Sequence, residues 1–415
     1  MEGVSATLPE PLSGRQEVAV VRHPIADARN TVVGYELRFG GSVDLGDPAM
    51  DAKATSALLV EAFGDIGLET LAGRHPAWVT IARNFLVEIG PPPVRPDRAV
   101  LQIKAYHAQA DLLQILQKLT RSGYTIALDE YDGTVSANVA ELMSLCSIVK
   151  VDVSAVAPED LPGVLATPKM QGALLVATEV ADHAAFERCR ALGFTYFEGE
   201  YFAQPRVFKH RGVATAGLGS LRRLSELTAG DVSFEDLERI IASDVGLSLK
   251  LLRYVNSAFF ALPRTVSSVR EALNMLGVRT VRRWATVMTI SSIPDVPDEL
   301  VGLGLRRAHM CEILAGSALP EERETLFTIG LFSVADALLS APMDEVLKSL
   351  PFTDEIQEAL LRREGPKGEL LAAVCAYERG EFPTLAAAAD PASPSLAGAY
   401  RAALEWADEA GRAIA

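Results

Sequence analysis

The feature that most constrains the fold is a series of short β-rich segments alternating with helical stretches between residues 17 and 205. Several of these segments are continuous apolar runs, which is typical of strands buried on both faces of a sheet. Such alternation predicts a parallel sheet, and about eight strands close into a TIM-like α/β barrel. The predicted strands are residues 18–22, 32–37, 77–82, 100–103, 125–129, 148–152, 174–178 and 196–197.

The turn-like segment 26–30 separates the first two predicted strands. The alternative to parallel pairing is therefore an antiparallel hairpin formed by these two strands. Helices are predicted between the later strands and also before the third one. The helical stretches are residues 51–63, 109–122, 139–145 and 183–192.

The character of the chain changes after the barrel segment, 17–205. Residues 206–220 are rich in glycine and other small residues, which suits a linker. In residues 221–415 helical periodicity replaces the β-rich runs, so this part is predicted to be an all-α domain. Residues 1–16 are predicted to form a flexible tail.

Two helices of the second half have clear start signals. Ser233 and Ser268 are each followed three residues later by an acid, Asp236 and Glu271 respectively. A serine hydroxyl at this position accepts a hydrogen bond from the first turn, and an acid three residues on favours the same start. Both sequences therefore predict a capped helix.

Charge and composition exclude several classes of function. The 39 basic and 54 acidic residues give a net charge of −15, which disfavours DNA as a partner because non-specific binding relies on cationic surface. The lack of an apolar run of membrane-spanning length predicts no membrane partner. The four scattered cysteines predict buried thiols, and with the lack of a secretion signal they indicate a cytoplasmic protein. No cofactor is predicted.

Acidic residues stand at the ends of two predicted strands. Asp129 and Glu130 end one strand, and Lys150 and Asp152 end the next. The carboxyl ends of barrel strands meet at the mouth of the barrel, so these side chains are expected to lie close together. Carboxylates from two strands with a lysine between them are part of what a two-metal phosphodiester hydrolase requires.

These residues resemble the motifs of the EAL domain, the fold of cyclic di-GMP phosphodiesterases. Glu36, within Gly34-Tyr35-Glu36-Leu37, matches the metal-ligand glutamate of the name-giving motif. Asp129 and Glu130 match a pair of acids in the family, and Lys150 and Asp152 match its lysine–aspartate pair. The resemblance implies a vestigial ligand site at Glu36, Asp129, Glu130, Lys150 and Asp152. In the alternative interpretation, Lys150 only neutralises the acids and no ligand binds.

The resemblance is incomplete at several positions where the family carries metal ligands or phosphate-binding groups. Losing one general acid–base group typically lowers a rate by about 10²–10⁴, so these changes predict a degenerate site with no catalytic or metal-binding residues, and hence no enzyme. The departures are Thr80 for an asparagine, Lys104 for a glutamate, Thr178 and Ala181 for two glutamates, Glu198-Gly199 for a glutamine–glycine pair, and Gly40, near Arg38, for an arginine.

The all-α half resembles an HDOD domain, a catalytically inert relative of the HD phosphohydrolases. The resemblance is carried by residues 251–258, in which Asn256 and Ser257 close an amphipathic helix. Ser333 and Val334 stand where an HD enzyme has its metal-binding His-Asp pair, so a metal site is not expected here. The isolated His309 is predicted to be structural.

A basic cluster, Arg279, Arg282 and Arg283, lies beside Trp284 and allows two interpretations. Arginines and an aromatic ring together can bind nucleic acid through phosphates and stacking. The acidic balance of the chain favours the other interpretation, a helix face paired with neighbouring acids.

The tandem EAL–HDOD resemblance predicts a non-enzymatic module of bacterial signal transduction, in which the HDOD domain binds protein partners. One alternative is a receptor that binds cyclic di-GMP without hydrolysing it. Another is a weak cyclic di-GMP phosphodiesterase. The resemblance is also compatible with a homodimer.

Overall fold

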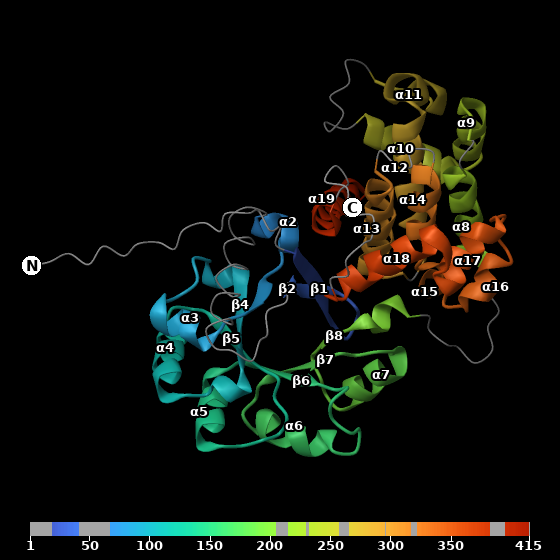
Figure 1. Ribbon diagram of the computed structural model, residues 1–415. Coiled ribbons are helices and arrows are strands. Elements are labelled where there is room, and N and C mark those ends of the chain that lie inside the picture. The colour runs from blue at the N-terminus through green and yellow to red at the C-terminus, as the bar shows by residue number, and fades with distance from the viewer. Residues whose placement is uncertain are drawn as a thin grey trace, which may run out of the picture.

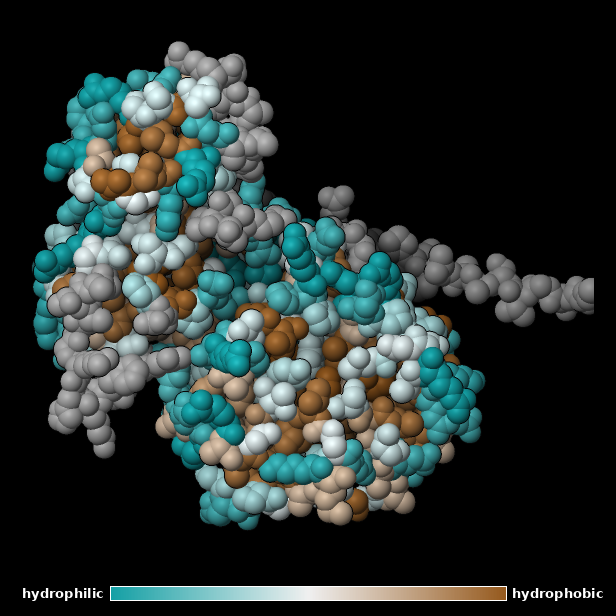
Figure 2. All heavy atoms as spheres, turned by 180° about the vertical axis from the view of Figure 1, so that it is seen from behind, coloured by the Kyte–Doolittle hydropathy of each residue, from teal (hydrophilic) through white to brown (hydrophobic). Residues whose placement is uncertain are grey.

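The computed structural model describes residues 19–40, 67–204, 215–229, 232–256, 265–294, 296–316, 322–381 and 395–414. The chain forms a barrel followed by a helical domain (Figure 1), and the view from behind shows them as two lobes (Figure 2). The predicted fold class is confirmed in both halves. The predicted tail 1–16 and the predicted helix 51–63 lie outside the described residues.

The barrel is closed by eight strands in chain order. Seven run parallel, whereas β1 pairs antiparallel with both β2 and β8, so the hairpin alternative is correct. In the hairpin turn, the carboxylate of Asp27 accepts hydrogen bonds from the backbone of Arg29 and Thr31 at 2.8 and 2.9 Å. The strands are β1 (Ala19–Asp27), β2 (Val32–Gly40), β3 (Ala77–Thr80), β4 (Ala99–Lys104), β5 (Thr125–Asp129), β6 (Ile148–Asp152), β7 (Leu174–Thr178) and β8 (Tyr196–Glu198).

Helices surround the strands because each carries one apolar face. In α4 (Ala110–Arg121), the buried leucines Leu112, Leu116 and Leu119 recur at helical spacing. Side chains cap two other helices: Ser136 begins α5 (Ala137–Leu145) and Asp182 begins α7 (His183–Ala191). The remaining elements of this half are α2 (Leu68–Ala72), α3 (Arg83–Glu88), α6 (Leu161–Met170), η2 (Pro96–Arg98), η3 (Ala105–His107) and η4 (Glu200–Ala203).

The described part of the second half is helical. Both capped starts are present, with the hydroxyls of Ser233 and Ser268 each accepting a backbone hydrogen bond at 3.1 Å. The helices are α8 (Thr215–Thr228), α9 (Phe234–Ala242), α10 (Val245–Val255), α11 (Val269–Leu276), α12 (Val278–Ile290), α13 (Asp298–Leu314), α14 (Arg323–Phe332), α15 (Ala335–Leu339), α16 (Met343–Leu347), α17 (Asp354–Arg362), α18 (Gly365–Glu378) and α19 (Leu396–Ile414).

Helix α8 begins at Thr215, inside the segment 206–220 that its glycine content suggested as a linker. Leu221 and Leu224 are fully buried on this helix. Their helical spacing therefore outweighs the low helix propensity of the glycines before them.

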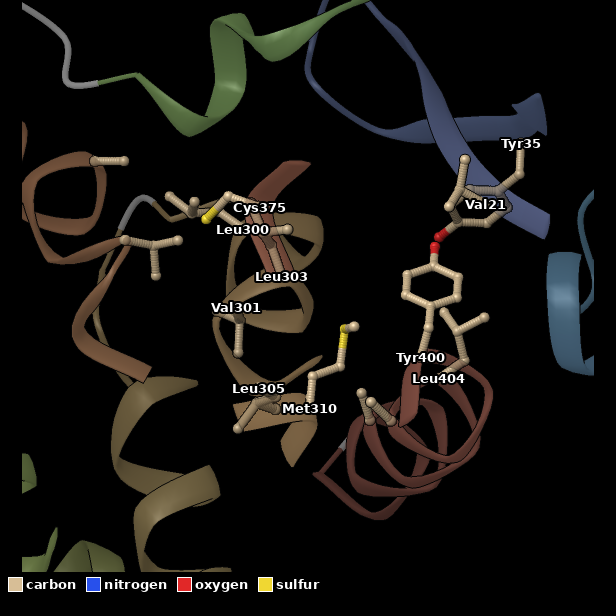
Figure 3. Packing of buried hydrophobic residues seen from close by; sticks show 14 of the residues in the cluster. Val21, Tyr35, Leu300, Val301, Leu303, Leu305, Met310, Cys375, Tyr400 and Leu404 are labelled. Carbon is tan, nitrogen blue, oxygen red and sulfur yellow. The ribbon is translucent and has the colours of Figure 1, made fainter. Parts of the chain in front are cut away.

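The two domains meet at a junction between β1, β2, α2, α18 and α19. The side chains of Tyr35 on β2 and Tyr400 on α19 point toward each other, with Val21 and Leu404 beside them (Figure 3). The Tyr35 hydroxyl also donates to Glu299 of α13 at 2.8 Å. The junction thus combines an apolar core with buried polar contacts.

The four cysteines are all free and buried, as predicted. No described helix has both the length and the apolar composition needed to cross a membrane.

Candidate functional site

The interior of the barrel consists of an apolar layer with a polar layer above it. Ile25, Trp78, Val100, Ala127, Ile148 and Val176 pack together inside the barrel. Alternate residues of a strand face the same side, so the residues two positions nearer the mouth also face inward. This second layer contains His23, Glu36, Thr80, Gln102, Asp129, Lys150, Thr178 and Glu198.

Gly34 makes room for the largest side chain of the apolar layer. A Cβ atom on Gly34 would lie 2.3 Å from Nε1 of Trp78. The indole fills the barrel below the polar layer, and the next inward residue of β2 is Glu36. A residue larger than glycine at position 34 would displace the tryptophan that lies beneath the site.

Lys150 lies at the centre of the polar layer. Its side chain is 2 % exposed, and its Nζ lies 3.0 Å from Glu36 Oε2 and 3.3 Å from Asp129 Oδ1. It also donates to the side-chain oxygen of Gln102. The structure therefore brings together three of the five predicted site residues, Glu36, Asp129 and Lys150.

The two carboxyl groups beside Lys150 have opposite pKa shifts. Burial disfavours ionisation of Glu36, but the charges of Lys150 and Arg38 outweigh it and lower the pKa of Glu36. Burial raises the pKa of Asp129, because Lys150 is opposed there by the negative charges of Glu36 and Glu130. The mouth thus pairs an ionised glutamate with an aspartate that binds a proton more readily.

The other two predicted site residues have different contacts. Glu130 has a left-handed backbone, with φ of 53°, and its carboxylate lies 2.9 Å from Nζ of Lys104. Asp152 accepts hydrogen bonds from the backbone and hydroxyl of Ser154 at 2.8 and 2.7 Å. Neither Glu130 nor Asp152 makes a described hydrogen bond or ion pair with Lys150.

A second charged group surrounds Glu198. Arg38 Nη2 lies 3.1 Å from Glu179 and 3.3 Å from Glu198, and Nδ1 of His23 lies 3.1 Å from Glu198. Burial opposes ionisation of Glu198, but His23, Arg38 and Lys150 together lower its pKa to about 2. Every described carboxylate in the polar layer therefore has a cationic or hydrogen-bonding neighbour.

A cavity of about 760 Å³ separates one side of the mouth from the helical domain. Arg38 and Glu179 line it on the barrel side, while Arg307, Ser333 and Arg379 line it on the helical side. Ser333, at the position of the HD histidine, accepts a hydrogen bond from Arg307 at 3.3 Å. The mouth therefore lies across this cavity from the Arg307–Ser333 contact of the helical domain.

The side chains do not fit the metal pair that the resemblance implies. The described residues include no group of three or more His, Cys, Asp or Glu placed to hold a metal ion. Instead, the ammonium of Lys150 lies between Glu36 and Asp129, which would be the first ligands of such a metal. No chemical step is therefore assigned to a metal.

The sequence prediction missed Gln102 and treated Glu198 only as a changed motif residue. Gln102 is fully buried and contacts Lys150. The sequence could have indicated Gln102, because it is a polar residue inside an apolar strand. In the sheet it pairs with Thr80 of β3. His309 is hydrogen-bonded to Glu312 at 3.0 Å, in line with a structural role. Of the three arginines predicted to pair with neighbouring acids, Arg282 and Arg283 pair with Glu324 and Glu312.

Comparison with known proteins gives a family match in the second half and relatives along most of the chain. A family model of the HDOD domain matches residues 220–347. The cyclic di-GMP phosphodiesterase CdgJ of Vibrio cholerae is 32% identical over 372 residues, covering 88% of this chain and 85% of the relative. The uncharacterized protein YuxH of Bacillus subtilis is 26% identical over 399 residues, covering 94% of this chain and 98% of the relative.

Among solved structures, the FimX EAL domain of Pseudomonas aeruginosa bound to c-di-GMP matches with 18% sequence identity and a TM-score of 0.36. The match covers 45% of this chain and 89% of that one.

The prediction that this chain is not an enzyme is wrong on this comparison, because a relative of nearly full length is named a phosphodiesterase. That prediction treated each departure from the EAL motifs as a loss of activity. The chain belongs to the family of tandem EAL–HDOD signalling proteins that includes CdgJ of Vibrio cholerae.

Proposed function

We propose that this chain is a cyclic di-GMP phosphodiesterase and that the mouth of its barrel binds the dinucleotide. The observation that supports this proposal is the 32% identity to CdgJ across 88% of the chain. The residues proposed to form the site are Glu36, Asp129, Glu130, Lys150 and Asp152.

The geometry suggests roles for two of these residues and for two cationic side chains nearer the rim. Lys150 can neutralise negative charge that develops on a phosphodiester oxygen. Asp129, whose pKa is raised by burial, can hold or accept a proton beside it. Arg38 and Lys104 lie nearer the rim, with side chains 32% and 17% exposed, and can attract the phosphates of the ligand.

The proposal is tested by incubating the purified chain with cyclic di-GMP, alone and with Mg²⁺ or Mn²⁺, and quantifying the linear dinucleotide. We expect product from the wild type and a loss of about a hundredfold or more in rate for Lys150→Met. Lys348→Met is the matched control, because this side chain directly after α16 is 72% exposed. Glu130→Gln tests the mouth without disturbing a buried group, because its side chain is 51% exposed.

The absence of linear product under all three conditions contradicts the proposed hydrolysis. Calorimetry with cyclic di-GMP separates the two parts of the proposal. Saturable binding without product would leave the ligand assignment intact and refute the chemistry. No binding and no product would refute both.

We further propose that the helical domain binds a protein partner through α10. Val245 and Leu249 on this helix are 73% and 61% exposed, and they lie one turn apart on the same face. Replacing both with serine should abolish co-purification of a native partner, whereas Lys250→Ser, at an exposed position on another face of the same helix, should not. Recovery of the same partners with all three proteins would contradict this surface. Homodimerisation stays a prediction.

A further inference from the structure

The helical domain contains a second charged cavity that the proposed function does not use. It has a volume of about 310 Å³, and α8, α12, α13 and α14 line it. None of the barrel residues that the structure describes contributes to its wall. The charged lining residues are Arg279, Arg282, Arg283, Glu312, Arg323 and Glu324.

One face of α12 supplies most of the positive charge. Arg282 and Arg283 follow Arg279 by three and four residues respectively, which places both beside Arg279 on the helix. Thr286, the next residue of this row, also lines the cavity. The spacing of the basic cluster therefore directs all three guanidinium groups to the same space.

Two of the arginines are held in place by acids from other helices. Arg282 pairs with Glu324 of α14, and Arg283 pairs with Glu312 of α13. The side chain of Arg282 is 13% exposed, so its position is set by packing as well as charge. These pairs fix the shape of the cationic wall.

The remaining charge is unbalanced. Arg279 and Arg323 are exposed and form no ion pair with a described carboxylate. Among the described lining residues, four arginines against two glutamates leave two excess positive charges. This excess occurs in a chain whose net charge is −15, so it is a local feature of the cavity.

We propose that this cavity binds the phosphate monoester group of a small molecule. A phosphate monoester carries close to two negative charges at neutral pH, and planar guanidinium groups match its oxygens. The volume lies near the lower end of the range of about 300–1,000 Å³ for small-molecule sites. Leu227 and Phe327 supply an apolar part of the wall for the rest of the ligand.

The test compares guanosine monophosphate with cyclic guanosine monophosphate in calorimetry on the full chain. The two share a base and sugar, but only the first has a monoester. We expect the monoester to bind more tightly, and inorganic phosphate to compete with it. In the double variant Arg279→Ser, Arg323→Ser, affinity should fall by about tenfold for each guanidinium removed. Both residues are exposed and form no ion pair with a described carboxylate, so the fold should tolerate the change.

The matched control is Arg188→Ser with Arg253→Ser. It changes net charge equally, and both residues are exposed and lie outside the cavity. Retained affinity in this control, with loss in the first double variant, supports the site. Equal binding of both nucleotides, equal loss in both double variants, or no saturable binding of guanosine monophosphate or phosphate would overturn it. None of these outcomes depends on activity at the barrel mouth.

Discussion

Arg22 on the first strand of the barrel forms a two-pronged contact with Asp408 on the last helix. Its Nη2 and Nη1 atoms lie 2.8 and 3.1 Å from the two carboxylate oxygens. The guanidinium is 3% exposed, and the two residues are 386 positions apart. This ion pair therefore ties the barrel to the helical domain.

Replacing Asp408 with alanine should lower the free energy of unfolding by about 1–3 kcal/mol, because Arg22 remains buried without its counter-charge. The Arg22 guanidinium would then keep its hydrogen bond to the backbone carbonyl of Leu71, at 3.1 Å. Urea denaturation measures the change. Asp344→Ala, which removes an exposed pair with Lys348, should cost under about 1 kcal/mol. Equal losses in both variants would contradict a structural role for the junction pair.

Lys150→Met should destabilise the barrel by about 3–5 kcal/mol at neutral pH, because it leaves Glu36 and Asp129 buried without an ammonium between them. Adding Glu36→Gln to this variant should recover part of the loss, since one uncompensated charge is then removed. A double-mutant cycle by chemical denaturation measures the coupling. Additive effects of the two changes would show that the contact contributes nothing to stability.

The acid stability of the chain should depend on Glu198. Its pKa is lowered from 4.5 to about 2 in the folded state, so its contribution is complete above pH 4.5 and is lost as pH falls toward 2. The shift corresponds to about 3 kcal/mol. Denaturation series across this range should show a shallower loss for Glu198→Gln than for wild type. The exposed Glu187→Gln is the control, and an unchanged slope for Glu198→Gln would refute the linkage.

Gly330→Ala should destabilise the helical domain by about 1–3 kcal/mol or more, because overpacking forces helices apart. A Cβ atom there would lie 2.4 Å from the backbone oxygen of Arg307, where α13 and α14 pack closely. Gly219→Ala on α8 meets no atom within 4 Å and should be stabilising by up to about 1 kcal/mol. Thermal unfolding compares them, and similar melting temperatures would contradict the close approach.

Local pattern was enough to predict most of the barrel. Strands β5, β6 and β7 have the predicted limits, because each is a short apolar run with clear flanking signals. Strand β1 extends to Asp27, beyond the predicted end at residue 22. The apolar run stops at Arg22, but pairing with both β2 and β8 keeps the backbone extended.

The site was predicted only in part, since its contacts depend on closure of the barrel. Because the carboxyl ends of barrel strands meet at the mouth, the sequence correctly predicted that Asp129 and Lys150 lie together. It could not show that Gln102 and Glu36 reach the same ammonium from strands distant in sequence. Pairs across the junction, such as Arg22 with Asp408, leave no local signal at all. The non-enzymatic prediction failed because counting changed motif residues does not measure what the remaining groups can do.

Strand β1 serves both domains with adjacent residues. Arg22 faces α2 and α19, while the ring of the next residue, His23, lies between Glu198 of β8 and the carbonyl of Glu378 at 2.9 Å. A slip of one residue in the β1–β2 register would exchange these faces and break both sets of contacts. The position of the helical domain on the barrel therefore depends on the β1–β2 register. Insertions or deletions in the β1–β2 hairpin should therefore change how the two domains are placed more readily than they unfold either domain.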